Sequence, residues 1–439
     1  MRHQIASNDR VHGRLRVVRS MAAFAALASG VAACGDIFSL KQENPGQLST
    51  ATLYIPANAQ LLTNGAIADF ECAFARYVVG SGLLVDELIT AIAQTANYDY
   101  ERRTIPPNAA GYGTGTCAGA SQQPSIYTTL STARATADTA LARMEGWSDA
   151  EVANRTRLIG QLATYAGYSL TLLGEGMCSA AINVGPEMTP AELFAEAKLR
   201  FDKAVAAATT ANDAQTLSFA RLGRARAAQN AGDLAAAAAD AALVPAGFVA
   251  NMSTDDVNTR RQNFVFVHTG QNFHSSVDPS FRGVQLNGAP DPRVLVTNTG
   301  RAGTAPNVVV WTANKYPLRT SPIPIAKYAE GQLIVAEARA AAGDVTGAQT
   351  AINNARNTRP GMPQYDATGQ TATQVRDQII EERRRELFLE GHRLGDIRRY
   401  QLPLNPAAGT AYTTGGGSYG NQSCFPLPDV ERINNPNIQ

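Results

Sequence analysis

Apolar residues recur at helical spacing through most of the chain beyond residue 66. The first such stretch, 67–93, carries Phe70, Phe74, Tyr77, Val78, Leu84, Leu88 and Ile92. Two more, Ile126–Met144 and 152–173, each place an apolar stripe on one face. A further helix is predicted from Pro190 to about Ala208, because Thr189 can cap its first turn and proline suits its first position. The pattern predicts a mainly α-helical domain.

Two segments, Ala225–Leu243 and Ala336–Pro360, share one pattern. Each predicts a helix, a Gly-Asp turn and a second helix, with small residues that let the paired helices approach closely. The pattern resembles the tetratricopeptide repeat, and Pro360 stands where such repeats often end. Two copies are too few for a stable solenoid, so we expect them to pack on further helix pairs. An ordinary alanine-rich helical hairpin is the alternative, mainly for the first copy.

The regularity stops in three places. Proline, glycine and polar residues predict loops or a tether in 41–64 and 104–125. Residues 245–324 are rich in Asn, Gly, Pro and Thr, and the alternation in Asn263–His268 with the β-branched run Val308–Trp311 predicts a short hairpin there. Long loops on a rigid scaffold are where binding sites usually lie.

The N-terminal sequence is typical of a secretory signal peptide. Five arginines precede an apolar run from Met21 to Ala33, which is too short for a permanent membrane span of about 20 residues. The sequence Val31-Ala32-Ala33-Cys34-Gly35 resembles the lipobox of bacterial lipoproteins. The resemblance implies cleavage before Cys34 and diacylation of its thiol. The alternative is an ordinary signal peptide with a coincidental cysteine.

Charge and cysteine count refine this interpretation. The 439-residue chain has a formal charge of +1, which gives no basic field for nucleic acid, and removal of residues 1–33 makes the charge −3. Export to an oxidising compartment allows disulfides. With Cys34 set aside for lipid, four cysteines allow three connectivities. We favour Cys72–Cys117 with Cys178–Cys424, the second tying the tail to the helical body.

Residues 378–400 mix apolar and charged side chains densely. We predict a helix that Gly391 ends, with Glu386 and Glu390 on one face. The residues expected to face inward are Val375, Ile379, Ile380, Leu387 and Phe388. A second turn presents Asp396, Arg398 and Arg399. A solvated charged face is one interpretation. We favour a half-buried lattice of ion pairs that locks this helix to the body, because apolar and charged positions alternate too closely for an outer face.

Several motifs here resemble the SusD/RagB family of outer-membrane nutrient-binding lipoproteins. Glu382–Tyr400 is similar to its E-R-x-x-E-L-x-x-E-G-x-R-x-x-D-x-x-R signature. Other similar elements are Asp291-Pro292-Arg293, Glu330–Arg339, the tail Phe425-Pro426-Leu427-Pro428 with Glu431-Arg432 and Asn434–Asn437, and the pair Asp86-Glu87. The lipobox cysteine and the repeat-like helices are family features too. The resemblance spans nearly all of the chain after the signal peptide.

The resemblance implies a SusD-like fold: mainly α, with tetratricopeptide-type helix pairs and a loop-rich region with a few short strands. The expected organisation is a signal peptide at 1–33, a tether at 34–65 and one domain at 66–439. That domain divides into a helical half (66–250), a loop-rich region (251–324) and a second helical half (325–439).

Such proteins are lipid-anchored on the outer-membrane surface. They bind oligosaccharides or peptides, and they cap a SusC-like TonB-dependent transporter that imports them. They carry no catalytic residues and no cofactor. The alternative from another class is a lipid-anchored, tetratricopeptide-type scaffold for envelope assembly that has no nutrient ligand.

Enzyme motifs are weak. Gly416–Gly420 matches G-x-S-x-G, but no histidine follows it, so the hydrolase order of Ser, Asp and His is impossible. Adjacent acids such as Asp86-Glu87 would point apart on a helix, and we interpret them as helix-surface charge. No His-Glu-x-x-His or Cys-x-x-Cys motif exists, which argues against a dedicated zinc site.

Ligand contacts are sought among aromatic residues, because flat apolar ring faces stack on pyranose rings. Tyr98 and Tyr100 lie in a polar stretch, and Trp311 lies in the irregular centre. These three are the predicted ligand contacts. The alternative for each is a packing role in the core or in a loop.

Overall fold

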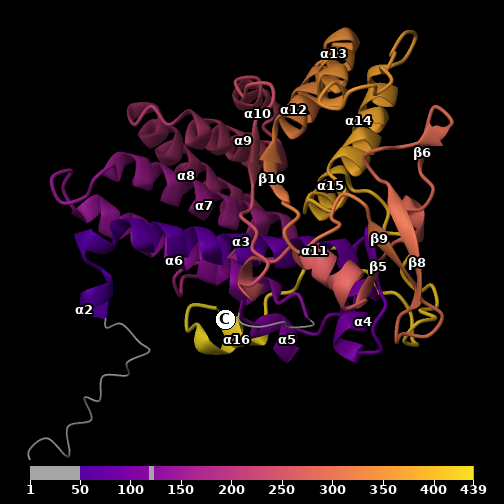
Figure 1. Ribbon diagram of the computed structural model, residues 1–439, viewed down its shortest axis with the longest axis horizontal. Coiled ribbons are helices and arrows are strands. Elements are labelled where there is room, and N and C mark those ends of the chain that lie inside the picture. The colour runs from indigo at the N-terminus through magenta and orange to yellow at the C-terminus, as the bar shows by residue number, and fades with distance from the viewer. Residues whose placement is uncertain (1–49, 118–122, 439) are drawn as a thin grey trace, which may run out of the picture. The chain divides into compact units, whose positions relative to one another are not determined.

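The computed structural model describes residues 50–117 and 123–438 (Figure 1). The chain divides into two units, residues 1–55 and 56–439. In the first, the described part contains the helical turn α2 (Thr50–Leu53). The predicted signal peptide and Cys34 lie outside the described residues.

Helices make up most of the second unit, which confirms the predicted fold class. The longer helices are α3 (Ala59–Leu84), α6 (Ile126–Gly146), α7 (Arg155–Gly176), α8 (Pro190–Thr210), α9 (Ala214–Asn230), α10 (Leu234–Ala241), α12 (Tyr328–Ala341), α13 (Val345–Arg356), α14 (Ala372–Glu386) and α15 (Arg393–Tyr400). Successive members pack side by side from α3 through α6, α7, α8, α9 and α10 to α12, α13 and α14 (Figure 1). Within the described ranges, no helix combines the length and apolar character that a bilayer span requires.

Shorter helical segments and two-stranded ladders fill the remainder. The segments are α4 (Thr95–Glu101), α5 (Ala110–Gly113), α11 (Phe264–Phe266), α16 (Asp429–Asn434), a π-helical turn (Val267–Gln271) and 3-10 turns at Pro56–Asn58, Thr259–Arg261 and Pro279–Phe281. The antiparallel pairs are β1 (Leu88–Thr90) with β5 (Ser275–Val277), β2 (Ala180–Ala181) with β3 (Glu187–Met188), β4 (Val249–Asn251) with β10 (Pro324–Lys327), β6 (Gln285–Leu286) with β7 (Ala289–Pro290), and β8 (Val296–Ala302) with β9 (Val309–Ala313).

Helix α8 forms as its sequence predicts. The Thr189 hydroxyl accepts the Glu192 N–H, and the Glu192 carboxylate accepts the Thr189 N–H at 2.7 Å, so two free donors of the first turn are satisfied. Its neighbour α7 is buried nearly all round from Leu158 to Gly176. The Tyr168 ring of α7 packs edge-on against Phe201 of α8, with ring centroids 5.2 Å apart. These contacts make the α7–α8 pair the centre of the helical half.

The two repeat-like segments form helix pairs, as predicted. Asp233 caps α10 by accepting the Ala236 N–H, and Asp344 caps α13 by accepting the Gly347 N–H. Gly232 and Gly343 adopt φ of 86° and 78°, a conformation that glycine reaches without a Cβ penalty. The Gly-Asp pair therefore provides both the turn and the cap of each second helix.

The hairpin predicted at 263–268 is wrong in one of its two strands. Val309–Ala313 is a strand, but its partner is β8, with Trp311 opposite Asn298. Residues Phe264–Phe266 are helical instead, because the Asn263 side chain accepts the Phe266 N–H and caps the turn. Alternation of two phenylalanines is too short a pattern to separate a strand from one helical turn.

The helix predicted over 67–93 begins sooner, at Ala59, and ends at Leu84. Leu88 belongs to β1, because its strand pairs with β5 from the loop-rich region. The start at Ala59 falls inside the segment 34–65 that was expected to be a tether. The loop predicted at 104–125 contains the short helix α5.

The helix that Gly391 was predicted to end stops earlier, at Glu386. The turn that follows is stabilised by contacts from distant segments. The carbonyls of Phe388 and Leu389 accept hydrogen bonds from Lys315 Nζ (2.6 Å) and from the Tyr316 hydroxyl (3.1 Å). Because these side chains satisfy the backbone carbonyls, the carbonyls do not require hydrogen bonds within a longer helix. Glu390 therefore lies beyond the helix that carries Glu386.

Candidate functional site

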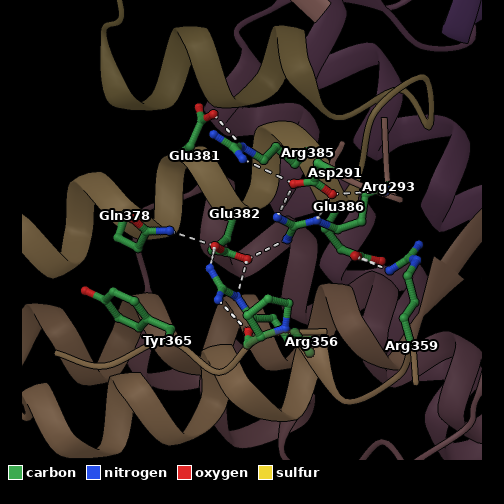
Figure 2. Close-up of polar contacts among 12 residues, drawn as sticks. Asp291, Arg293, Arg356, Arg359, Tyr365, Gln378, Glu381, Glu382, Arg385 and Glu386 are labelled. Atoms are coloured by element: carbon green, nitrogen blue, oxygen red, sulfur yellow. Dashed lines mark hydrogen bonds and ion pairs between the residues drawn. The ribbon is translucent and has the colours of Figure 1, made fainter. Parts of the chain in front are cut away.

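Glu382 and Glu386 of α14 lie in a buried ionic network (Figure 2). The Glu382 carboxylate is nearly inaccessible to solvent and lies between two arginines from distant segments. Arg293 donates to it at 2.6 Å, Arg356 forms a second ion pair with it, and the Gln378 amide donates at 2.7 Å. Arg293 also binds Asp291 at 2.7 Å. Burial alone would raise the pKa of Glu382, but the arginines outweigh it and lower that pKa.

A second part of the network joins Glu386 and Glu390 through one lysine. Lys327 Nζ lies 3.0 Å from Glu386 Oε1 and 2.8 Å from Glu390 Oε2. Arg359 pairs with the other oxygen of Glu386, and Lys315 Nζ lies 2.6 Å from Glu390. Burial opposes charge on Glu386, yet Lys327 and Arg359 lower its pKa. Glu386 and Glu390 do not share a helix face as predicted, because α14 ends at Glu386, but both carboxylates bind Lys327.

Further ion pairs connect this region to the helical half. Arg383 holds Asp396 at 2.9 Å, and Arg226 of α9 holds Glu175 of α7 at 2.6 Å. All four side chains are at most 5% exposed. Charges removed from water to this degree persist only when paired. The interpretation as an ion-pair lattice, rather than a solvated face, agrees with the structure.

The pair Asp86-Glu87 is not the helix-surface charge that the sequence suggested. Asp86 forms an ion pair with Arg393 at 2.7 Å, and the Glu87 side chain is buried, accepting the Leu389 N–H at 2.8 Å. Burial raises the pKa of Glu87 to about 8, although the Leu389 N–H opposes this shift. Both residues follow α3, where Asp86 meets the start of α15 and Glu87 meets the turn after α14, so they join two halves of the chain.

One more buried acid lies close to the network. Glu330 in the first turn of α12 lies 3.9 Å from His392, and burial raises the pKa of Glu330 to about 7 despite the nearby arginines. Burial lowers the pKa of His392 well below its ordinary value, and the positive charges of Arg226 and Arg383 lower it further. The histidine is therefore neutral at neutral pH and serves as a packing and hydrogen-bonding group.

Two of the three predicted ligand contacts are buried, which corrects that prediction. Tyr98 packs edge-on against Tyr412 with ring centroids 5.7 Å apart, and Tyr100 packs against Phe425 at 5.9 Å. Tyr100 is only 2% exposed, so no ring face is open to a sugar. Their alternative role, packing in the core, matches these positions.

Trp311 is half-buried on β9 and remains the predicted ligand contact. Its backbone N–H donates to the Ser276 hydroxyl at 2.8 Å, which fastens β9 to β5. The Arg282 guanidinium lies 5.2 Å from the ring centroid, a cation–π arrangement. Phe273, which the sequence analysis did not select, is likewise half-buried, with Arg301 4.8 Å from its ring centroid. Its position as an aromatic residue within the loop-rich region could have marked Phe273 as a candidate ligand contact in the sequence.

The sequence and the fold were both compared with those of known proteins. No curated protein matches the sequence. The sequence model of the SusD family matches residues 246–435, which include Asp291, Arg293 and all of α14 and α15. Residues 246–435 belong to the SusD family. The resemblance inferred from the sequence is confirmed over these residues.

Solved structures extend the SusD assignment of the fold beyond the matched residues. A SusD-like carbohydrate-binding protein from Bacteroides vulgatus has a TM-score of 0.64 at 17% identity, covering 88% of this chain and 97% of that one. A SusD superfamily protein from Bacteroides fragilis gives 0.67 at 15% identity, with 88% and 99% covered. Surface glycan-binding protein A from Bacteroides thetaiotaomicron gives 0.63 at 13%, with 87% and 97% covered. The helical half is therefore part of the same fold, although the family's sequence model does not reach it.

Two disulfides fasten the SusD-like fold. Cys72 is bonded to Cys117, and Cys178 is bonded to Cys424, which is the connectivity that we favoured among three. Beside the second bond, the Cys178 N–H donates to the Phe425 carbonyl at 2.8 Å. The C-terminal tail is thereby joined to the end of α7.

The sequence analysis missed the lysines of the network. Lys327 and Lys315 lie far from α14 in sequence, and neither belongs to a charged run. The available signal was Lys327 itself, a lone cation after the apolar segment Ile323–Ala326, where an unpaired charge would be costly.

Proposed function

We propose that the chain is a surface lipoprotein of the outer membrane that binds oligosaccharides or peptides and delivers them to a SusC-like TonB-dependent transporter. The SusD fold over 88% of the chain is the observation that carries the proposal. It is supported by neighbours named for carbohydrate and glycan binding. The chain binds its ligand without converting it.

The arrangement of charges favours a binding role. Glu382 and Glu386 of α14 form ion pairs with arginines and a lysine of the same chain, so these acids stabilise the fold. A body stiffened by this network and by two disulfides suits the presentation of binding groups on the irregular segments between the helices. Trp311 on β9 is the aromatic residue that we assign to ligand contact there.

Membrane attachment is assigned to Cys34 from the lipobox resemblance. The outer membrane, lipid attachment and surface exposure are parts of this proposal. The Cys34→Ser variant should leave the membrane fraction and appear in the soluble fraction. Ser29→Ala, a small substitution in the same segment, should stay in the membrane and serves as the matched control. Retention of Cys34→Ser in membranes would contradict the anchor.

Co-purification tests the delivery step. The full chain is isolated from detergent-solubilised outer membranes, and its partners are identified by mass spectrometry. A TonB-dependent barrel protein in stoichiometric amount is the expected partner. Repeated absence of such a barrel would overturn the uptake role and favour the envelope scaffold that the helix pairs also suit.

A further inference from the structure

The two disulfides differ in how far solvent reaches them. Cys178 is exposed just after α7, and its partner Cys424 is half-buried in the irregular segment that follows α15. Cys72 of α3 is only 3% exposed, and its partner Cys117 is half-buried. A disulfide is opened by a thiolate that attacks one of its two sulfurs, so access to those sulfurs limits the rate. The bond between Cys178 and Cys424 is therefore the more open target for a thiol in solution.

Hydrogen bonds hold the backbone of Cys178 beside that of Cys424 independently of the sulfurs. The Cys178 N–H donates to the Phe425 carbonyl at 2.8 Å, and the Phe425 N–H donates to the Gly176 carbonyl at 2.8 Å. The Phe425 side chain is fully buried, and its ring packs against Tyr100 with ring centroids 5.9 Å apart. None of these contacts involves a sulfur atom, so we expect them to persist when the disulfide is opened.

Side-chain contacts fix the chain next to each cysteine as well. Before the first cysteine, Arg398 Nη1 donates to the carbonyls of Glu175 at 2.7 Å and Met177 at 2.9 Å. Before the second, the Gln422 side chain accepts the Ile105 N–H at 2.7 Å and donates to the Ile105 carbonyl at 2.9 Å. Both segments are therefore positioned by hydrogen bonds to other parts of the fold, and cleavage of the disulfide leaves those bonds intact.

Two thiols placed in this way stay close to each other. The Cα atoms of Cys178 and Cys424 lie 5.0 Å apart, within the range of bonded cysteines, and the backbone contacts above maintain that distance. Re-formation of the bond is then an intramolecular reaction, which a high effective concentration favours. The opened form nevertheless lacks a crosslink across 246 positions of sequence, so its resistance to unfolding should be lower.

We propose that Cys178 and Cys424 form a redox-active pair, which an external dithiol opens and an external disulfide closes while the fold and the Cys72–Cys117 bond are retained. In the opening reaction, a thiolate of the dithiol attacks the Cys178 sulfur, the bond between the two protein sulfurs breaks, and Cys424 leaves as a thiolate. The second thiolate of the reagent then attacks the mixed disulfide and releases Cys178. The reagent supplies two electrons and ends as a disulfide, and its two protons pass to the protein thiols. Closing follows the same exchange steps in reverse.

Reduction of the folded exported chain tests the pair, with Cys34→Ser to keep the predicted anchor cysteine out of the count. The protein is treated with dithiothreitol at mildly alkaline pH without denaturant. At successive times its free thiols are alkylated with iodoacetamide and located by peptide mass spectrometry. Cys178 and Cys424 should become alkylated at least tenfold faster than Cys72 and Cys117. Removal of the dithiol and addition of oxidised glutathione should restore the Cys178–Cys424 bond.

Circular dichroism of the partly reduced protein tests whether the fold is retained. The near-ultraviolet spectrum should be unchanged, and the midpoint of thermal unfolding should fall to that of the double variant Cys178→Ser/Cys424→Ser, which is the matched control. Equal alkylation rates at the four cysteines, or faster opening of the Cys72–Cys117 bond, would overturn the proposal. Loss of the folded spectrum in step with reduction would overturn it too, and so would reoxidation to a different pairing.

Discussion

The Arg393 guanidinium donates two hydrogen bonds of 2.7 Å, one to each oxygen of the Asp86 carboxylate, across 307 positions of sequence. This bidentate geometry is the strongest form of an arginine–carboxylate contact. It joins the end of α3 to the first turn of α15. The N-terminal helices and the SusD-family region therefore meet through a specific ion pair as well as through apolar packing.

Removal of Arg393 should show how much its ion pair with Asp86 contributes to stability. Both side chains are only 11–12% exposed, so Arg393→Ala leaves Asp86 largely buried without its partner. We expect the free energy of unfolding in urea to fall by about 3 kcal/mol or more. Arg376→Ala is the control, since its ion pair with Asp377 is more than half exposed, and should cost less than about 1 kcal/mol. Equal effects of the two variants would show that the junction is not stabilised by this pair.

The buried Glu87 predicts how stability depends on pH. Its pKa is raised by burial from 4.5 to about 8, so the folded protein holds a proton that the unfolded chain releases at lower pH. The stability contributed by this proton is fully present below about pH 4.5 and is lost as the pH rises through 8. Glu330, with a pKa raised to about 7, acts in the same direction.

Glu87→Gln should therefore flatten the fall in stability between pH 5 and pH 8. The amide keeps an acceptor for the Leu389 N–H and cannot ionise. The measurement is the free energy of unfolding at pH 5, 6.5 and 8, where the wild type should lose on the order of a few kcal/mol that the variant retains. Glu145→Gln, at a 42% exposed side chain, is the control and should follow the wild type. A variant with the wild-type slope would contradict the assignment.

These contacts also show where sequence reasoning succeeds and where it fails. The boundaries of α8 follow from Thr189, Pro190 and Glu192, because caps and first-turn preferences act within a few residues. Leu88 fits the apolar spacing of a helix, but it pairs in β1 with Val277. The sequence around Leu88 cannot indicate a strand partner that lies so far along the chain. Propensity yields to tertiary pairing at such positions.

The ionic network has the same limit. The acids and arginines of 378–400 predict a lattice, but Glu382 meets Arg293 from 89 positions away and Arg356 from 26. A single sequence specifies the residue types and not their partners. The predicted stacking of Tyr100 on a sugar was wrong for a related reason. Its neighbours in sequence are polar and suggest an exposed ring, but in the structure Tyr112 and Phe425 pack against that ring.

The disulfide between Cys178 and Cys424 should contribute strongly to stability. It closes a segment of 246 positions, and a crosslink that long removes much of the conformational freedom of the unfolded chain. Replacement of both cysteines by serine should lower the free energy of unfolding by about 2–5 kcal/mol. Peptide mapping by mass spectrometry should recover the pairs Cys72–Cys117 and Cys178–Cys424 from the exported protein. Four free thiols in that protein would refute both bonds.

Helix α9 approaches α8 closely at Gly223. A Cβ atom added there would lie 2.3 Å from the Phe201 ring, which is itself fully buried and cannot move aside. Gly223→Ala should therefore destabilise the protein by about 1–3 kcal/mol through overpacking, measured as a lower midpoint of thermal or urea unfolding. Gly146→Ala at the end of α6 meets no atom within 4 Å and should be neutral or slightly stabilising. A neutral Gly223→Ala would mean that the two helices can separate without cost.

Trp311 offers a direct optical test of ligand contact. The chain has two tryptophans, so Trp147→Phe leaves Trp311 as the single indole reporter. Its ring is half-buried beside Arg282, and a ligand that stacks on the remaining face would exclude water from it and shift its emission to shorter wavelength. Titration with the bound oligosaccharide or peptide should produce a saturable shift, and Trp311→Ala should weaken binding tenfold or more. Arg282→Lys keeps the charge but loses the planar contact, and a several-fold loss is expected. An unchanged emission spectrum at saturating ligand would remove Trp311 from the binding surface and leave the loop-rich region without an aromatic contact at β9.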